Sequence, residues 1–308
     1  MSIDFNIMRE PGFYNRIQET REKDLQSVLE WINVDECPVC KSKDVTEIKF
    51  KKKIPYAVCC SCEALYAKEI PSILNHAEYN IGNINDLDYD EKKREYKQER
   101  FVEERINLIK QHSNKPLSNC RLLDFGCGTG VFLEKAKDFF ETVVGVEDSK
   151  YLREYINDKF KIDTYQFLPD EKFDVITLFD VLEHLKDPYD ILCTCKKLLN
   201  DKGVIFIYTP NWRSLEFDIL KEKNTQYFPS EHLWFASLVT LYQLAHKLDM
   251  NIVYDASCGL DCYDVLAYIR DIKGYDINEY INFNDVEKIQ DMINELGKGN
   301  HLRIMLRK

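Results

Sequence analysis

The chain has 308 residues, of which 44% are hydrophobic and 31% are charged. This length favours one large domain with a smaller companion, and the apolar fraction suffices for a substantial core, which excludes fibrous and wholly disordered classes. The formal net charge is −11. Because proteins that neutralise a nucleic-acid backbone usually carry a basic balance, the composition argues against DNA or RNA as a partner.

The N-terminal residues lack the cationic start and apolar stretch of a secretory signal, so we expect a cytoplasmic protein. No apolar run approaches the roughly 20 residues that cross a bilayer, and we expect no membrane partner. In a reducing compartment the 11 cysteines should be thiols or metal ligands rather than disulfides. The sequence carries no signature of a particular oligomeric state.

Four regions are predicted along the chain. Residues 1–36 form an N-terminal helical segment, with an amphipathic helix at 16–31. A cysteine-rich ribbon occupies 37–70, and a connector with a charged helix occupies 71–117. This charged helix is expected either to cover the cofactor site as a lid or to pack against the sheet. The main domain fills 118–308.

Apolar strands alternate with helices in the main domain. Strands are expected at 121–125, 142–146, 173–179, 204–208, 251–255 and 301–306, and helices at 131–140, 151–160, 188–199 and 237–248. Continuous apolar strands that alternate with helices indicate a parallel sheet covered on both faces. The predicted fold class is therefore α/β, with a doubly wound and mostly parallel sheet.

Two C-x2-C pairs predict a zinc ribbon. Cys37 and Cys40 form the first pair, and Cys59 and Cys62 form the second after a stretch of strand character. Each pair on a tight turn aims two sulfurs at one point, so the two turns complete a tetrahedral thiolate site. Four thiolates leave no open position, which predicts a structural zinc ion with Cys60 outside the site. The alternatives are that Cys60 replaces one of its neighbours, or that these cysteines are buried thiols without metal.

The segment LLDFGCGTG, residues 122–130, places a glycine-rich turn between a predicted strand and a predicted helix. Glycines permit a sharp turn and close approach of a ligand to the backbone. A dinucleotide would favour G-x-G-x-x-G, whereas this turn reads G-x-G-x-G. The carboxylate of Asp124, just before the first glycine, would repel a pyrophosphate and attract the ammonium group of a methionine moiety.

This segment resembles motif I of class I S-adenosylmethionine (SAM) dependent methyltransferases, and the later strands resemble the later motifs of that family in the same order. The resemblance runs from about residue 117 to the C-terminus and implies a seven-stranded sheet, a transferase activity and SAM as cofactor. The cofactor contacts that it implies are Asp124, Phe125, Gly126, Gly128, Gly130, Glu147, Asp148, Phe167, Leu168 and Asp180. Within this set Glu147, with Asp148 as second choice, would accept hydrogen bonds from the ribose hydroxyls. The alternatives are a helix-dipole partner for Asp124 and a solvated strand end for Glu147.

Acids and histidines follow the predicted fourth strand. Asp180, Glu183 and His184 occur as D-x-x-E-H, and His232 comes later. The turn resembles the E-x-x-E-H turn of ubiquinone-biosynthesis O-methyltransferases and small-RNA 2′-O-methyltransferases, with Asp180 in place of the first Glu. The resemblance implies a second divalent cation at these four residues, and Mg, Mn or Zn suits such ligands. The alternatives are that His184 or His232 accepts a proton without metal, or that the cluster only positions its loop.

The acceptor is predicted from weaker features. The aromatic-rich segment 213–234 is expected to form a lid, whose rings either stack on a sugar or pack beneath the loop. The segment GKGNHLR, residues 297–303, resembles the end of methyltransferases of polysaccharide and glycosylated-metabolite pathways. We therefore expect O-methylation of a carbohydrate, free or nucleotide-linked, or of a related small metabolite. The alternatives are C- or N-methylation of a sugar, an RNA or protein substrate docked by the ribbon, and a SAM-fold module without catalysis.

Overall fold

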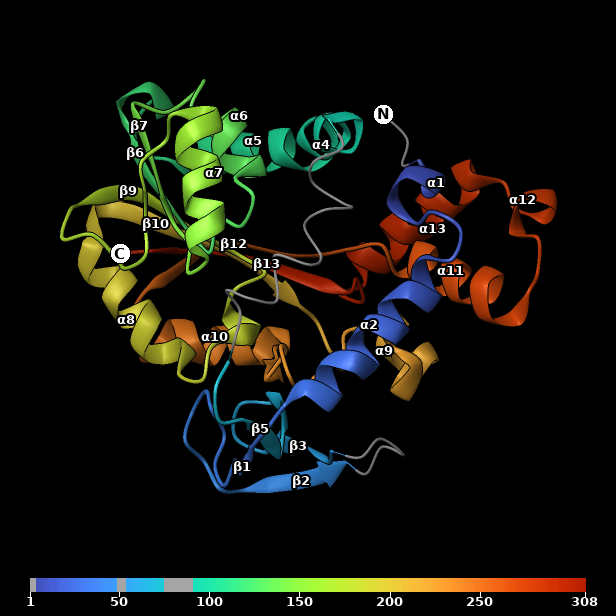
Figure 1. Ribbon diagram of the computed structural model, residues 1–308. Coiled ribbons are helices and arrows are strands. Elements are labelled where there is room, and N and C mark those ends of the chain that lie inside the picture. Colours follow the sequence, from blue (N-terminus) through green and yellow to red (C-terminus); the bar gives the residue numbers. More distant parts are fainter. Residues whose placement is uncertain (1–3, 49–53, 75–90) are drawn as a thin grey trace.

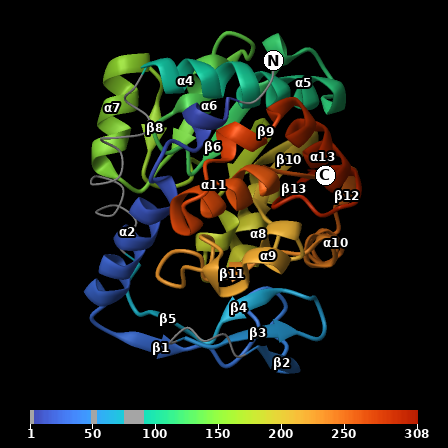
Figure 2. The ribbon, with the colours of Figure 1, turned by 90° about the vertical axis from the view of Figure 1, so that its right-hand side faces the viewer.

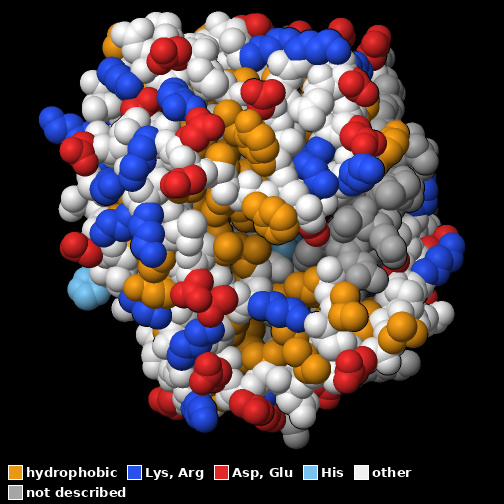
Figure 3. All heavy atoms as spheres, turned by 60° about the vertical axis from the view of Figure 1, so that its left-hand side comes forward, with side chains coloured by type: hydrophobic (Ala, Val, Ile, Leu, Met, Phe, Trp, Pro, Cys, Tyr) orange, Lys and Arg blue, Asp and Glu red, His pale blue; other side chains and the backbone are white. Residues whose placement is uncertain are grey.

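The structure is a computed structural model that describes residues 4–48, 54–74 and 91–308. The tip of the predicted ribbon hairpin and residues 75–90 of the predicted connector lie outside these ranges. None of the helices in the described ranges combines the length and the apolar character needed to cross a bilayer. On the face shown in Figure 3, the described acidic and basic side chains are interspersed around a strip of hydrophobic ones rather than gathered by sign.

A seven-stranded sheet forms the centre of the molecule (Figure 1), in the order β12-β13-β10-β9-β6-β7-β8. Its strands are β6 (Arg121–Phe125), β7 (Thr142–Val146), β8 (Thr164–Tyr165), β9 (Phe173–Phe179), β10 (Leu199–Pro210), β12 (Asn251–Cys258) and β13 (His301–Arg307). The strands from β8 to β10 pair in parallel, whereas β13 runs antiparallel to both of its neighbours. The predicted α/β class, with a mostly parallel seven-stranded sheet, is confirmed.

Helices cover both faces of this sheet (Figure 1). One face carries α5 (Glu103–His112), α6 (Val131–Ala136) and α7 (Lys150–Phe160), and the other carries α8 (Pro188–Leu198) and α10 (Leu238–Lys247). The consecutive residues Leu122 and Leu123 are both fully buried and belong to different hydrophobic clusters. Because successive side chains of a strand point to opposite faces, a strand that is apolar throughout fits a sheet buried on both sides.

The helical lead-in is continuous over the described residues. The helix α4 (Glu91–Lys97) passes through a π-helical turn (Gln98–Val102) into α5. The first segment of the chain folds as α1 (Phe5–Met8) and α2 (Phe13–Ser27). The predicted helix at 16–31 was wrong at its end, because Val28 is extended and Trp31–Asn33 forms β1, which pairs with β5 (Glu69–Pro71).

The C-terminal part adds helices that the sequence analysis missed. They are α9 (Leu215–Leu220), α11 (Asp261–Lys273), α12 (Ile277–Tyr280) and α13 (Phe283–Glu295). The helix α11 anchors the N-terminal segment (Figure 2), since the Asp271 carboxylate accepts hydrogen bonds from the backbone N–H groups of Gly12 and Tyr14. The rings of Tyr14 and Tyr268 then meet edge to face, 5.1 Å apart. The N-terminal segment and the C-terminal helices therefore pack against each other.

The cysteine-rich segment belongs to a four-stranded sheet of order β11-β4-β3-β2 (Figure 2). Its strands are β2 (Val45–Ile48), β3 (Tyr56–Cys59), β4 (Leu65–Ala67) and β11 (Trp234–Phe235). The strand β11 comes from the segment predicted as a lid, whose aromatics Tyr227, Phe228 and Trp234 are buried. Of the two alternatives for these rings, packing beneath the loop is the one observed. Side chains of the ribbon and of one face of the large sheet share a single hydrophobic cluster.

Candidate functional site

The four predicted thiolates converge on one point. The sulfur atoms of Cys37 and Cys62 are 3.5 Å apart, those of Cys40 and Cys59 are 3.4 Å apart, and all four lie within 4.8 Å of one another. Sulfurs bound at about 2.3 Å from a zinc ion would be roughly 3.8 Å from each other. Cys60 is exposed and lies outside this group. The donor set therefore fits a closed structural zinc site.

Local backbone geometry explains this convergence. In each pair a hydrogen bond of 2.9 Å closes the turn, from the N–H of Lys41 to the carbonyl of Cys37 and from the N–H of Glu63 to the carbonyl of Cys59. Lys41 and Glu63 both adopt left-handed backbone conformations, with φ of 63° and 57°. Two turns of the same type thus present their sulfurs to each other.

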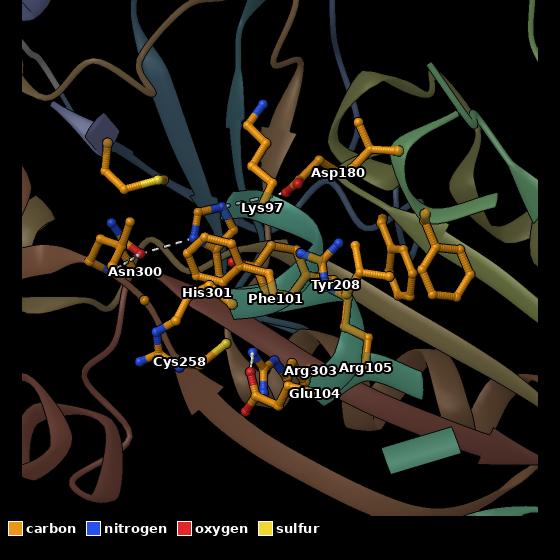
Figure 4. A pocket seen from close by; sticks show the side chains of 18 of the residues that line it. Lys97, Phe101, Glu104, Arg105, Asp180, Tyr208, Cys258, Asn300, His301 and Arg303 are labelled. Atoms are coloured by element: carbon orange, nitrogen blue, oxygen red, sulfur yellow. Dashed lines mark hydrogen bonds and ion pairs between the residues drawn. The ribbon is translucent and has the colours of Figure 1, made fainter. Parts of the chain in front are cut away.

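A cavity of about 600 Å³ opens at the carboxyl ends of β6, β9 and β10 (Figure 4). This volume lies within the range of small-molecule sites. Of the predicted cofactor residues, Asp124, Gly126, Gly128 and Asp180 line it. Ligands of open α/β sheets bind at such strand ends. The cavity is closed on its other side by Met8 of α1, by Arg9 after this helix, and by residues of α11 and α13 that include Asp264 and Asp291.

The glycine turn leaves room beside its backbone. Gly126, Gly128 and Gly130 all have positive φ, of 75°, 54° and 74°. A Cβ atom on Gly126 would lie 2.5 Å from the Val181 side chain, and one on Gly130 would lie 3.0 Å from Ile156. A Cβ on Gly128 would meet no atom of the described residues within 4 Å. Gly126 and Gly130 are thus required by the fold, whereas at Gly128 the open side is available to a ligand.

Asp124 is a buried carboxylate at this turn, 3% exposed. Its Oδ1 accepts a hydrogen bond of 2.6 Å from the hydroxyl of Thr177. Burial raises the pKa of Asp124 to about 7, against the lowering effects of Thr177 and the Arg105 guanidinium. A bound cation would restore the ionised form, because an opposite charge nearby favours it. The desolvated carboxyl of Asp124 therefore lies beside the open cavity, where a ligand could contact it.

Glu147 stabilises the glycine turn by accepting hydrogen bonds from backbone N–H groups. Its two carboxylate oxygens accept hydrogen bonds of 2.9 Å from the N–H groups of Gly128 and Ser149, and burial raises its pKa. Asp148 is exposed and accepts a hydrogen bond from the side-chain amide of Gln166. Each oxygen of Glu147 keeps a second lone pair, so these backbone bonds leave it able to accept from a ligand.

The remaining predicted cofactor residues do not reach the cavity. Phe125 and Leu168 are half-buried and pack against the core, whereas Phe167 is 75% exposed. These three side chains, together with Gly130, Glu147 and Asp148, are not among the residues that line the cavity. The cofactor contacts expected of Phe167 and Leu168 therefore stay a prediction.

The sequence analysis missed Arg105, which projects into the cavity from α5 (Figure 4). Its guanidinium carbon lies 4.5 Å from the ring centres of both Phe179 and Tyr208. Among the described residues, no carboxylate forms an ion pair with Arg105, and its buried Nε has no hydrogen-bond partner. The sequence shows Arg105 only as one charge among many in a helix. Its inward orientation depends on the sheet against which α5 packs.

The second predicted cluster is assembled only in part. Ligand atoms of Glu183, His184 and His232 lie within 4.8 Å of one another, and the two imidazole rings are 4.8 Å apart. Glu183 is 1% exposed, and its carboxylate accepts a hydrogen bond of 2.9 Å from Thr209. The Nδ1 of His232 lies 3.0 Å from the carbonyl oxygen of Gln226, so this nitrogen carries the proton. The Nε2 of His232 then carries a lone pair, with which it could coordinate a metal ion or accept a proton.

Asp180 does not join this group. Its backbone is left-handed, with φ of 56°, and its carboxylate lies 3.4 Å from the Nε2 of His301 inside the cavity. The prediction of a four-residue metal site that includes Asp180 is therefore corrected to a three-residue cluster. None of these three side chains lines the cavity, whereas Gln226, whose carbonyl contacts His232, does. The cluster lies behind the wall of the cavity.

Comparison with known proteins identifies the family. Residues 91–255 match the family described as "Methyltransferase domain", which is more than half of the 308 residues. The chain belongs to this methyltransferase family. The match begins at α4 and ends within β12, so it includes the glycine turn and both sides of the sheet.

Curated relatives of the methyltransferase chain include two ubiquinone biosynthesis O-methyltransferases. That of Pelagibacter ubique (strain HTCC1062) is 36% identical over 126 residues, which are 36% of this chain and 52% of the relative. That of Pasteurella multocida (strain Pm70) is 34% identical over 128 residues, which are 35% of this chain and 52% of the relative. The chain thus spans about half the length of the curated relatives that it matches.

A solved structure supports the same fold. The plantazolicin methyltransferase BamL, crystallised with a triazolic desmethylPZN analog and SAH, aligns with a TM-score of 0.50 and 16% identity. The alignment covers 76% of this chain and 92% of BamL. At this level of identity the likeness concerns the fold alone.

Proposed function

We propose that this chain transfers a methyl group from SAM to a hydroxyl of a carbohydrate, free or nucleotide-linked, or of a related small metabolite. The observation that carries the proposal is the buried carboxyl of Asp124 beside an open glycine turn at the carboxyl ends of the sheet. SAM brings a methyl group on a cationic sulfur and needs an anionic contact for its ammonium group. The names of the curated relatives favour an oxygen as the methylated atom.

We assign the cofactor site to residues on two sides of the cavity. Asp124 would bind the ammonium group of SAM, and the backbone at Gly126 and Gly128 would approach its amino-acid tail. Arg105, which has no carboxylate partner among the described residues, suits the carboxylate of the same tail. Glu147 does not line the cavity, and it holds the turn in place by accepting a hydrogen bond from the N–H of Gly128. Its contact with the ribose hydroxyls stays a prediction.

The opposite wall of the cavity suits a polar acceptor. The side chains of Arg9, Asp264 and Asn300 line it, and those of Asp264 and Asn300 are buried. Asn300 and Arg9 both donate hydrogen bonds to the carboxylate of Asp264, and this carboxylate keeps further lone pairs to which a substrate hydroxyl could donate.

We assign a structural zinc ion to Cys37, Cys40, Cys59 and Cys62. Glu183, His184 and His232 would hold a second divalent cation such as Mg, Mn or Zn, with one carboxylate and two imidazoles as ligands. A metal ion in a methyltransferase can polarise an acceptor hydroxyl. These three side chains lie behind the cavity wall. We therefore assign them the role of holding the segment that follows Gln226 in place.

The test is a binding and transfer experiment. Calorimetry with S-adenosylhomocysteine (SAH) should show one site per chain, and absence of binding would reject the proposal. Transfer from methyl-labelled SAM is then measured with free sugars, sugar nucleotides and hydroxylated ubiquinone precursors, with and without EDTA. Labelling of a sugar supports the acceptor class, and labelling of a ubiquinone precursor alone replaces it with the class that the names of the relatives suggest. If EDTA abolishes methyl transfer and a divalent ion restores it, the cluster of Glu183, His184 and His232 would have a catalytic role.

A further inference from the structure

His301, at the start of β13, lies in the cavity and belongs to no group assigned so far (Figure 4). Its ring stacks on Tyr208, with centres 4.6 Å apart and an angle of 13° between the planes. The Nδ1 atom lies 2.9 Å from the Oδ1 of Asn300, and the Nε2 atom lies 3.4 Å from a carboxylate oxygen of Asp180. The side chain is 16% exposed, so its ring is held but still accessible.

The orientation of the Asn300 amide determines which nitrogen of His301 carries a proton. Asn300 is 2% exposed, and its Nδ2 donates hydrogen bonds to Glu216, at 2.7 Å, and to Asp264, at 3.0 Å. Its Oδ1 accepts from the backbone N–H of Leu260, at 3.2 Å. A backbone N–H can only donate, so the atom that it meets is the amide oxygen. The Nδ1 of His301 therefore faces an acceptor and must carry the hydrogen.

The backbone around Asn300 is built for this orientation. The N–H of Asn300 donates to the carboxylate of Asp261 at 2.8 Å. A Cβ atom on Gly259 would lie 2.7 Å from the backbone nitrogen of Asn300, and one on Gly299 would lie 2.5 Å from the carbonyl oxygen of Cys258. Only glycine lets these segments approach so closely. The amide is thus fixed from every side, so in the neutral ring of His301 the hydrogen is on Nδ1 and the lone pair is on Nε2. The Asp180 carboxylate lies 3.4 Å from this Nε2, and no hydrogen bond joins the two groups.

We propose that His301 is the general base of the methyl transfer, with Asn300 as the positioning residue that fixes its tautomer. The inference rests on the proposed function and names a residue for it. The Nε2 of His301 takes the proton from the acceptor hydroxyl while the acceptor oxygen forms its bond to the methyl carbon. The bond between methyl and sulfur breaks, and its electron pair stays on sulfur as SAH. Asp180, next to Nε2, stabilises the imidazolium that results.

The comparison with the other histidines favours His301. His184 and His232 lie behind the cavity wall, and His232 turns its Nδ1 toward a carbonyl of the segment that it holds. His301 alone among these three lines the same cavity as Asp124 and Asp180. A general base must come within hydrogen-bond reach of the proton that it removes. Within the described residues, His301 meets this requirement best.

The tautomer can be measured without an acceptor. Nitrogen-15 NMR of the histidine-labelled full chain with bound SAH should show His301 protonated on Nδ1 and unprotonated on Nε2, with its signals assigned through the variant His301→Asn. Asn300→Ala should allow both tautomers while SAH still binds. Protonation of the neutral ring on Nε2 in the native protein would overturn the inference, whatever the acceptor proves to be.

A second experiment measures the kinetics of matched histidine variants, with the acceptor that was labelled in the transfer screen as substrate. His301→Asn should keep the SAH affinity within about twofold and lower kcat by about 100-fold or more, with a much smaller change in KM. His246→Asn, at an exposed position of α10, is the control and should leave both unchanged. If His301→Asn retains full kcat while His232→Asn loses it, the base is His232 and the inference fails although methyl transfer stands. Failure of the native chain to bind SAH rejects the proposed function instead.

Discussion

The two groups of candidate metal ligands differ in how their residues meet. The four cysteines come from two short turns, each closed by its own backbone hydrogen bond. Glu183 and His232 come from segments far apart in the chain, and they meet because the N–H of Leu233 donates to the carbonyl of Glu183 at 2.8 Å. The first group is determined by local geometry, and the second depends on the docking of a loop against the end of β9.

This difference explains which predictions were correct. The spacing of the cysteines predicted their convergence, because a C-x2-C turn has few conformations available. The order D-x-x-E-H did not predict the position of Asp180, whose left-handed backbone turns its side chain toward His301. The glycine turn resembles the cysteine turns in its left-handed backbone, with positive φ at all three glycines, although Val181 and Ile156 from other segments also leave no room for side chains at two of them. The following predictions test this contrast, from the largest effect to the smallest.

The largest effect is expected for Cys37→Ser. Structural zinc contributes on the order of 10–16 kcal/mol in isolated zinc-finger peptides, so loss of a ligand should remove the ion and unfold the ribbon. The main domain should lose stability as well, because Trp212 and Thr240 donate hydrogen bonds to the carbonyls of Glu63 and Cys62. Zinc content and the melting temperature are the measurements. Cys60→Ser is the matched control, and an equal loss in both variants would contradict the assignment.

Asp124→Asn should weaken SAH binding by about tenfold to 150-fold, which corresponds to about 1.5–3 kcal/mol for a hydrogen bond to a charged group. The amide keeps the size of the side chain and removes the negative charge that the ammonium group requires. Calorimetry provides the affinity. An unchanged affinity would mean that the glycine turn binds another part of the ligand, or none.

The SAH affinity of the native chain should fall as the pH is lowered from about 8 to about 6, by up to about tenfold per pH unit below the pKa. The reason is that burial raises the pKa of Asp124 to about 7, and only its ionised form attracts the ligand. The contribution of Asp124 to the free energy of unfolding has the opposite pH dependence. A raised folded-state pKa stabilises the fold at low pH, and this contribution is lost as the pH rises through 7. Both dependences should be weaker in Asp124→Asn.

Glu183→Gln tests whether the assembled cluster holds an ion. If the cluster binds a divalent cation, the variant should lose one metal ion per chain and a few degrees of melting temperature. If the cluster is empty, removal of a buried carboxylate whose Oε1 has no hydrogen-bond partner among the described residues should leave stability unchanged or raise it. Metal analysis beside a melting curve separates the two results. Zinc at the cysteines should be unaffected in either case.

The smallest effect is expected from a pair of glycine variants. Gly126→Ala and Gly274→Ala both place a side chain at a φ near 75°, which costs about 1–2 kcal/mol. Only Gly126→Ala adds a contact of 2.5 Å with Val181, whereas a Cβ on Gly274 meets nothing within 4 Å. The free energy of unfolding should therefore fall further for Gly126→Ala, by the cost of moving Val181. Equal losses would show that backbone conformation accounts for the whole effect.

The sequence by itself determined the elements whose signal is local. The apolar strands at 121–125, 142–146 and 173–179 were predicted at their observed bounds, and the thiolate turns were predicted by their spacing. These features follow from the periodicity of side chains along a strand and from the conformations open to short turns. The ribbon was predicted from the same kind of signal, although its sheet borrows β11 from a segment expected to be a lid.

The tertiary structure alone decided which distant residues meet. Arg105 reaches the cavity because α5 packs on the sheet, and Asn300 fixes His301 because α9 and α11 place Glu216 and Asp264 beside it. No period or spacing in the chain predicts these contacts, since each joins segments that are far apart in the sequence. Local sequence therefore predicted the glycine turn and the ribbon, whereas the opposite wall of the cavity could be described only from the packing of the two ends of the chain.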